Sequence, residues 1–461
     1  MNINGQRCTK KEQRFAADAV RLCLAGLLML NAACTYRSAV DKPLTQWSPA
    51  MDHRAGKQLK GDRSADLAVL VSFSGGGTRA SAFAYGALQE LAATEIRTAQ
   101  GSRPLLHEID MISSVSGGSF TAAYYGLHGE QIFTDFEARF LRKDVEGILF
   151  RKMFNPLNWA RLMSRAYGRS DLAAKYYDEE LFDAATFAKL QQADRPLIVI
   201  NATDLASGER MPFVQDTFDV LCADFSAYPV SHAVAASSAV PVIFSPITLE
   251  NYAGRCGYQP PAWVAEALRD EALSRRKIAA RDILDLQDRN KRPWLHLVDG
   301  GISDNLGMRA FYDTLSIADD PAAAARDQLH WEARHILIIS VNAYAKHKSD
   351  WILERYAPSL FEVIGSVSAD QISRYSEDTI QLVRDTFETW VKDHSTAARP
   401  VTFHFVDVSF NHVKDDDERN FLNGIGTNFN LSDEQVDRLI AAARKILRES
   451  EDFQAFIKLN R

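Results

Sequence analysis

Short apolar runs that end at polar or glycine-rich turns recur along the chain. The first, at 68–73, contains several Val and Leu residues and stops at Ser74, which is typical of a buried strand. Helix-prone, Ala-rich stretches follow it at 79–95 and, after a second run, at 120–127. Strands that alternate with helices predict an α/β protein with helices on both faces of a sheet. The predicted strands are 68–73, 109–113, 197–201, 242–244, 295–298, 336–341 and 401–408.

Two further stretches indicate additions to this α/β core. The segment at about 260–292 is charged and helix-prone, and it separates two predicted strands, so we expect a helical surface insertion. Near the C-terminus, Ser432 and Gln435 have the spacing of a capping box, and apolar residues follow at helical intervals. We predict an amphipathic C-terminal helix there that packs on the core.

The first 34 residues differ in character from the rest of the chain. Basic residues precede a short apolar run at 22–30 and small residues follow it, as in a secretory signal peptide. A membrane-spanning helix would need about 20 apolar residues. The run leads into Asn31-Ala32-Ala33-Cys34, which resembles a bacterial lipobox except that Asn31 replaces the usual Leu. We therefore expect a lipoprotein signal at 1–33 and lipidation of Cys34; a plain signal peptide or an uncleaved anchor is the alternative.

The rest of the chain divides into three segments. Segment 34–65 is largely polar and contains prolines, so we expect a linker that holds the body off a membrane surface. We assign 66–345 to the core of one domain and 346–461 to a mostly helical part that completes it.

Charge and cysteine content limit the classes of function. Lys and Arg total 53 and Asp and Glu total 60, so the formal net charge is −7. Coating nucleic acid would require a basic excess, and we expect no nucleic-acid partner. Cys222 and Cys256 can pair in an oxidising compartment or stay free and buried. The spacing of Cys and His suggests no zinc site. We expect no metal and no other cofactor.

The strongest chemical signal is the sequence 114–118, between a predicted strand and a predicted helix. A serine on such a turn is lifted clear of the backbone, and glycine neighbours prevent a steric clash. Ser116 is the serine here with glycine at both following positions, Gly117 and Gly118. The helix behind it adds a dipole that favours a developing anion. Ser116 is therefore a candidate nucleophile; a Ser/Gly-rich turn is the structural alternative.

A glycine-rich turn follows the strand at 68–73. Gly75, Gly76 and Gly77 can direct several backbone N–H groups into one small volume, which suits an oxyanion. A phosphate loop is the competing interpretation. It is weaker because Ala80 stands where the third glycine of a dinucleotide-binding motif belongs.

The third signal is Asp299-Gly300-Gly301, at the end of the predicted strand 295–298. A carboxylate at the C-terminal end of a strand lies where open α/β sheets usually place their sites. Alone, this sequence is more often a turn. Three such signals, each at a strand terminus, favour a common site.

Together these motifs resemble the patatin-like phospholipases. The resemblance implies a three-layer α/β/α sandwich with a mainly parallel sheet, and a Ser–Asp dyad without a catalytic histidine. It makes Ser116 the nucleophile, Asp299 its partner, and Gly75, Gly76, Gly77 and Arg79 the oxyanion loop. The further likeness lies at 201–205, 235–241 and 304–307.

Two positions depart from the family's pattern. Ser114 and Ala80 each place a side chain near a tight turn, which would alter substrate fit more than abolish chemistry. The resemblance implies cleavage of acyl esters in membrane phospholipids or other lipids. Two alternatives remain open: a Ser-His-Asp triad that uses His404 or His412, and an inactive lipid-binding protein that keeps the fold.

One segment suggests contact with a membrane. Residues 147–170 contain no Asp or Glu, but five basic and four aromatic side chains. This combination suits anionic lipid headgroups; a helix pair with inward-packed aromatics is the alternative. With a lipidated N-terminus, we expect a lipoprotein of the bacterial cell envelope, anchored in the outer membrane and facing the periplasm.

Overall fold

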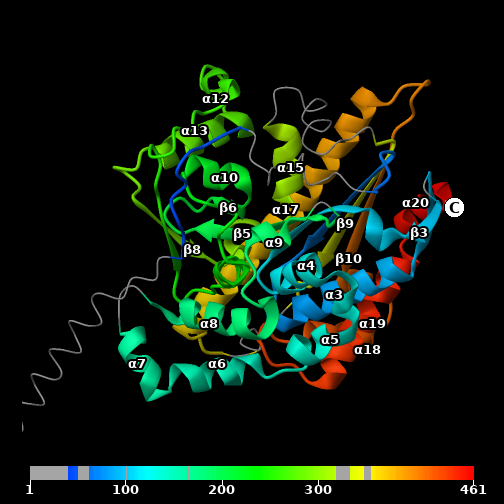
Figure 1. Ribbon diagram of the computed structural model, residues 1–461. Helices are drawn as coiled ribbons and strands as arrows, with labels where there is room; N and C mark the ends of the chain where they lie inside the picture. Colours follow the sequence, from blue (N-terminus) through cyan, green and yellow to red (C-terminus); the bar gives the residue numbers. More distant parts are fainter. Residues whose placement is uncertain are drawn as a thin grey trace, which may run out of the picture.

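An eight-stranded, mainly parallel sheet runs through the centre of the molecule (Figure 1). The computed structural model describes residues 40–49, 62–99, 101–163, 167–192, 194–317, 333–346, 353 and 355–460; the predicted signal peptide and Cys34 lie outside them. The strand order is β10-β9-β1-β4-β5-β8-β7, and β6 pairs with β5. The strands are β1 (Leu67–Phe73), β4 (Ile109–Val115), β5 (Leu197–Asp204), β6 (Arg210–Phe213), β7 (Ile247–Glu250), β8 (Trp294–Val298), β9 (His335–Asn342) and β10 (Thr402–Ser409).

Five of these strands, β10, β9, β1, β4 and β5, pair in parallel. By contrast β6, β7 and β8 pair antiparallel and form one flank of the sheet. Every residue of β1, β4 and β5 is buried, as expected for parallel strands that are covered on both faces. The predicted α/β class with a mainly parallel sheet is confirmed.

Alternate residues of β1 feed two separate apolar layers. Val69, Val71 and Phe73 pack with one set of helices, whereas Ala68 and Leu70 pack with the other set. The first layer is made by α3 (Gly77–Ala93), α4 (Gly117–His128), α11 (Val230–Ser237) and α19 (Asp433–Glu449). The second layer is made by α15 (Arg309–Ser316) and α17 (Leu360–His394). The result is the three-layer α/β/α sandwich that the resemblance implied.

Shorter elements fill the connections between these layers. Among the described residues, no helix has the length and apolar character needed to cross a bilayer. The remaining elements are β2 (Glu95–Thr98), β3 (Gly101–Pro104), η1 (Leu105–Glu108), η2 (Gly129–Gln131), α5 (Ile132–Phe136), η3 (Glu137–Leu141), α6 (Val145–Met153), α7 (Pro156–Leu162), α8 (Arg169–Tyr177), η4 (Asp178–Phe182), α9 (Phe187–Leu190), α10 (Gln215–Val220), α12 (Ala262–Ala267), α13 (Arg275–Gln287), α14 (Gly301–Asp304), η6 (Phe410–His412), α18 (Asp416–Asn423) and α20 (Glu451–Leu459).

The capping box at the start of α19 forms as predicted. The Ser432 hydroxyl accepts the Gln435 N–H, and the Gln435 side chain accepts the Ser432 N–H. Buried Val436, Leu439 and Ala443 then pack this helix onto the core, mainly against α3. In the segment 260–292, helices α12 and α13 stand between β7 and β8, with a small apolar cluster of their own.

One predicted strand is wrong. Residues 242–244 form a turn, and the strand begins only at Ile247. Prolines at 241 and 246 flank the turn, and a proline has no N–H to donate to a sheet ladder. Val242 has φ 74°, which is incompatible with a strand, and its side chain is exposed.

Of the predicted linker, the structure describes 40–49 and 62–65, and 40–49 lies against the body. The Leu44 N–H donates to the Cys222 carbonyl and the Trp47 N–H donates to the Cys256 carbonyl. Cys222 and Cys256 themselves form a disulfide. The Asp41 carboxylate is buried and accepts the Glu250 N–H. This part of the segment is therefore docked on the molecule, which differs from a free linker.

Candidate active site

The turn between β4 and α4 carries Ser116 in a conformation that is rare for a residue with a side chain. Its φ is 50° and its ψ is −121°. The backbone of the following residue is tightly packed: a Cβ on Gly117 would lie 2.0 Å from the Gly77 carbonyl oxygen. Glycine is therefore required at 117, and the predicted lifted serine is the geometry observed.

Ser116 and Asp299, predicted separately from two turns, lie in direct contact. The Ser116 hydroxyl donates to Oδ2 of Asp299 at 2.8 Å, and the Gly301 N–H donates to Oδ1 at 2.8 Å. Burial raises the pKa of Asp299 to about 6, although both hydrogen bonds favour the ionised form. The carboxylate is therefore mostly ionised at neutral pH and is a stronger base than an exposed aspartate.

Asp299 reaches this position by a route that the sequence did not indicate. β8 is antiparallel to β5, with Val298 opposite Thr203, so the chain after β8 runs back along β5. Gly300 then passes so close to Asn201 that a Cβ would lie 2.2 Å from its carbonyl oxygen. Asn201 is paired with Val115, the residue before the nucleophile. Antiparallel pairing, and not a shared carboxyl edge, brings the carboxylate to the serine.

The three predicted oxyanion glycines differ in what their N–H groups do. The Gly75 N–H donates to the Asn305 carbonyl at 2.9 Å. Gly76 (φ 138°) and Gly77 (φ 61°) form the start of α3, where helix geometry leaves the N–H groups without intrahelical partners. The Gly77 backbone also lies beside Gly117. The N–H groups of Gly76 and Gly77 are the ones the geometry favours as donors to an oxyanion.

The Arg79 side chain does not take part in that loop. Its Nε donates to the Ala343 carbonyl at 2.9 Å, and its terminal nitrogens donate to the Ile425 carbonyl and the Thr427 hydroxyl. The Thr78 N–H donates to the Asn428 carbonyl at 2.9 Å. Arg79 thus fastens a segment between α18 and α19, which we call the strap (425–428), against the glycine loop. The resemblance counts Arg79 among the residues of the oxyanion loop, and these contacts of its side chain support that loop from behind.

Sequence reasoning did not select Ser237 as a site residue. Its hydroxyl accepts the Ser116 N–H at 2.8 Å and donates to the Asn201 carbonyl at 2.6 Å. Its own carbonyl accepts the Gly300 N–H at 3.0 Å, so Ser237 contacts the turns of both Ser116 and Asp299. The only signal was its place in the stretch 235–241, one of the stretches that carried the family likeness.

The two histidines of the alternative triad have other contacts. The His412 Nε2 lies 3.1 Å from Asp407, and this hydrogen bond raises the pKa of His412. His404 lies in the outermost strand, β10, and its ring packs edge-on against Phe456. Among the described residues, the hydroxyl of Ser116 is hydrogen-bonded to Asp299, and neither histidine forms a hydrogen bond with Ser116.

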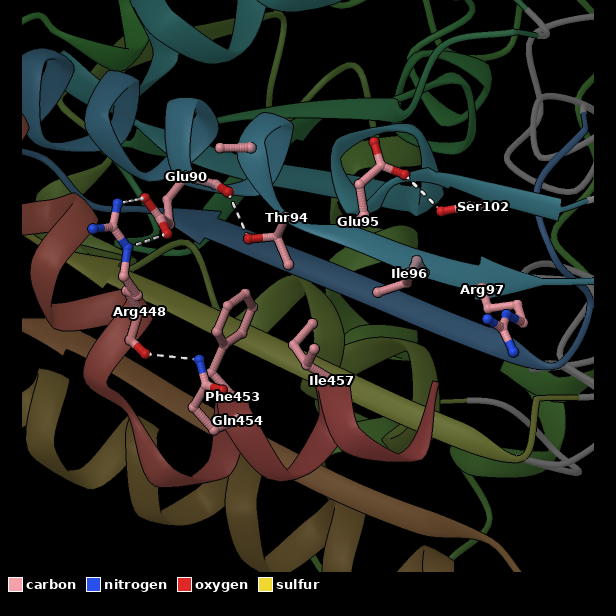
Figure 2. A pocket seen from close by; sticks show the side chains of 11 residues that line it. Glu90, Thr94, Glu95, Ile96, Arg97, Ser102, Arg448, Phe453, Gln454 and Ile457 are labelled. Carbon is pink, nitrogen blue, oxygen red and sulfur yellow. Dashed lines mark hydrogen bonds and ion pairs between the residues drawn. The ribbon is translucent and has the colours of Figure 1, made fainter. Parts of the chain in front are cut away.

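A surface cavity of about 620 Å³ has neither Ser116 nor Asp299 in its lining. Figure 2 shows the residues that line it. It is bordered by the end of α3, the hairpin β2–β3 and the junction of α19 and α20. Its main charged group, Glu90, is paired with Arg448 at 2.6 Å and with Arg444 at 3.3 Å. Within the described residues, no group of three or more His, Cys, Asp or Glu side chains is placed to hold a metal ion.

Comparison with known proteins identifies the class. The patatin-like phospholipase family matches residues 71–312, more than half of the chain. The chain therefore belongs to the patatin-like phospholipases, which are lipid-hydrolysing enzymes. The matched region contains the glycine loop, Ser116, Ser237 and Asp299. No significant match to a curated protein was found.

Solved structures of human GIVD cytosolic phospholipase A2 are more distantly similar. One is 12% identical, with a TM-score of 0.39, and the match covers 91% of this chain and 68% of that chain. A second, in complex with methyl gamma-linolenyl fluorophosphonate and terbium chloride, is 13% identical, with a TM-score of 0.37 and coverages of 92% and 66%. This chain thus spans about two thirds of the length of those proteins. The family assignment rests on the sequence match.

Proposed function

We propose that this protein is a serine acyl hydrolase in which Ser116 and Asp299 act as a catalytic dyad. The observation that carries the proposal is the 2.8 Å hydrogen bond from the Ser116 hydroxyl to Asp299. The hydroxyl belongs to a residue held at φ 50°, and the carboxylate is buried with a pKa of about 6. A base with a pKa near the working pH, in contact with a serine, is the arrangement that nucleophilic catalysis requires.

The reaction proceeds in two stages. Ser116 attacks the ester carbonyl carbon while Asp299 takes the hydroxyl proton, and the N–H groups of Gly76 and Gly77 stabilise the tetrahedral oxyanion. The protonated Asp299 then gives its proton to the departing alcohol, which leaves an acyl-enzyme. Asp299 then takes a proton from water as the water oxygen attacks the acyl carbonyl carbon; the bond to Ser116 breaks, the fatty acid leaves, and Asp299 returns the proton to the Ser116 oxygen.

The substrate in this proposal is a membrane phospholipid or another acyl-ester lipid. We also propose that Cys34 is lipidated after removal of 1–33, and that the protein is anchored in the outer membrane of a bacterial cell envelope, facing the periplasm. The sequence pattern of the N-terminus and the lipid substrate class of the family support both placements.

Hydrolysis of p-nitrophenyl butyrate by the purified full-length chain tests the dyad. Ser116→Ala and Asp299→Ala should each lower kcat/KM by about 10³-fold or more, because the two residues act as one unit. His404→Ala and His412→Ala are the matched controls and should retain most of the activity. A loss in the histidine variants equal to the loss in Ser116→Ala would overturn the dyad. Absence of turnover by the wild type would instead favour a lipid-binding protein.

A further inference from the structure

The turn at 241–243 overlaps the predicted strand 242–244 and carries two apolar side chains that are exposed to solvent. Val242 is 78% exposed and Ile243 is 53% exposed. Val242 also has φ 74°, a conformation that is strained for a β-branched residue. Backbone strain of this kind concentrates at functional sites, which makes the exposed Val242-Ile243 pair a candidate for a functional role.

This turn lies beside the dyad. The Ala239 carbonyl accepts the Asp299 N–H at 3.0 Å. Three residues of extended chain span at most about 11 Å, so Val242 lies within that distance of Ala239. Phe244, which follows Ile243, packs edge-on against Phe429 at 6.5 Å between ring centroids.

A second exposed apolar surface is joined to the first through Phe429. The Phe429 carbonyl accepts the N–H groups of Val145 and Glu146, at the start of α6. At its other end, the segment 145–163 leads to α8, where the Ser170 N–H donates to the Ser245 hydroxyl at 3.2 Å. We call the exposed side chains of α6, α7 and Met163 the α6–α7 ridge: Phe150, Phe154, Leu157, Trp159 and Met163.

The alternative for this segment, a helix pair with inward-packed aromatics, describes Tyr167, which is buried, but not the ridge. Leu157 is 86% exposed, and the stacked rings of Phe150 and Phe154 are also exposed. In sequence, segment 147–170 has five basic and no acidic residues, within a chain whose formal net charge is −7. Arg151 and Lys152 reach their nearest carboxylates only at 3.9 and 4.0 Å, and surface pairs of this length hold little energy.

We propose that turn 241–243 and the α6–α7 ridge form one docking surface for an anionic lipid bilayer. Exposed apolar side chains enter the headgroup and acyl boundary, while the basic residues bind lipid phosphates. Because turn 241–243 follows Ala239, whose carbonyl accepts the Asp299 N–H, docking through this turn brings the dyad towards the lipid. The inference rests on the proposed function for its substrate, but the binding itself does not need catalysis.

Vesicle co-sedimentation tests this surface. All proteins are full-length and carry Cys34→Ser, so that acylation cannot contribute to binding. The vesicles are phosphatidylethanolamine with phosphatidylglycerol, or phosphatidylcholine alone. The double variant Val242→Ser, Ile243→Ser and the single variant Leu157→Ser should each bind the anionic vesicles about tenfold or more weakly. Leu273→Ser is the matched control, because Leu273 is 69% exposed but lies in the insertion between α12 and α13; its binding should equal that of the parent.

Tryptophan quenching gives an independent measurement. Brominated phosphatidylglycerol vesicles should quench the parent protein, and Trp159→Phe should remove most of that quenching. Trp294→Phe should leave the quenching unchanged, because Trp294, although exposed at the start of β8, is not part of the proposed surface. Equal binding to both kinds of vesicle, or equal binding by the Ser variants and the parent, overturns the proposal. So does a dimer in analytical ultracentrifugation that Val242→Ser dissociates, since the surface would then bind a second copy.

The outcome is separable from that of the dyad. Ser116→Ala should bind vesicles like the parent protein while it fails to cleave p-nitrophenyl butyrate. If Ser116→Ala cleaves the soluble ester normally, the dyad is wrong, and the vesicle data still decide the surface.

Discussion

Ser116 is held in its left-handed conformation by neighbours on three sides. The Ser237 hydroxyl accepts its N–H, Asp299 accepts its hydroxyl, and the glycine at 117 lets the turn pass Gly77. A non-glycine residue in such a conformation costs about 1–3 kcal/mol, so the surrounding contacts must outweigh that cost. These contacts keep the hydroxyl at the position where it meets the carboxylate.

Asp299→Asn should remove activity and stabilise the fold at neutral pH. The pKa of Asp299 rises from 3.8 to about 6 on folding, so folding favours the protonated form. This carboxylate therefore opposes folding above about pH 6 and ceases to do so below about pH 4. Asn has no such charge, and the variant should gain up to about 3 kcal/mol in free energy of unfolding at pH 7.5.

Urea unfolding of both proteins at pH 7.5 and pH 4 measures this difference. The gain should shrink towards zero at pH 4, and a gain independent of pH would contradict the linkage. For the wild type, kcat/KM on a soluble ester should rise with pH to a plateau, with a midpoint near pH 6, because only the ionised Asp299 accepts the serine proton.

At the scale of elements, the start of α3 depends on the strap. The helix begins at Gly77, and the strap (425–428) lies across that start through Asn428 and the contacts of Arg79. Burial lowers the pKa of Arg79 to about 10, so the guanidinium remains charged at neutral pH. The buried Arg79 side chain and the hydrogen bond from the Thr78 N–H to the Asn428 carbonyl therefore join the glycine loop to the C-terminal part of the chain.

Arg79→Met should lower both stability and activity. It leaves the carbonyls of Ala343 and Ile425 without their donor, which should reduce the free energy of unfolding by about 2–5 kcal/mol. Arg79→Lys should restore only part of this, because one ammonium group cannot serve three acceptors in fork geometry. Chemical denaturation measures the loss, and limited proteolysis should detect cleavage at the strap.

Arg448→Met is the matched control for this variant. Arg448 is half exposed and pairs with Glu90 at the rim of the surface cavity (Figure 2). The variant should therefore lose no more than about 1 kcal/mol in free energy of unfolding. Equal losses in the two arginine variants would mean that Arg79 has no special role.

The sequence predicts correctly those elements in which an apolar run along the chain is also buried in the structure. The buried runs that became β1, β4 and β9 were visible from composition, and Ser116 and Asp299 were visible because catalysis needs those residue types at turns. The antiparallel course of β8 and the direction of Arg79 depend on residues distant in sequence, such as Thr203 and Ile425. Residues 242–244 are predicted as a strand because apolar runs normally indicate burial, but the side chains of Val242 and Ile243 are exposed.

At the scale of the whole molecule, the disulfide and the N-terminal segment stabilise the same region. Cys222 and Cys256 close a loop with a sequence separation of 34, and their carbonyls accept the N–H groups of Leu44 and Trp47. The Trp47 ring also donates to buried Asp219 at 2.9 Å. The segment 40–49 is thus attached to a part of the fold that a covalent bond holds closed.

Loss of the disulfide should lower stability measurably. Opening a loop of this length costs about 3–4 kcal/mol in the chain-entropy account, so reductant should lower the Tm of the wild type. The double variant Cys222→Ala, Cys256→Ala should have the lower Tm from the start and show no further response. A wild type whose thiols are fully freed without a change in Tm would contradict this.

The strap has a consequence for when the enzyme becomes active. Arg79 and Ile425 are 346 positions apart. The contact that clamps the glycine loop can therefore form only after almost the whole chain has been made. A polypeptide emerges N-terminus first, and the segments that bear Ser116 and Asp299 precede the strap. During synthesis the nascent chain therefore carries a nucleophile without a finished glycine loop. An enzyme shortened before residue 425 would therefore keep both residues of the dyad and lose the clamp on its glycine loop.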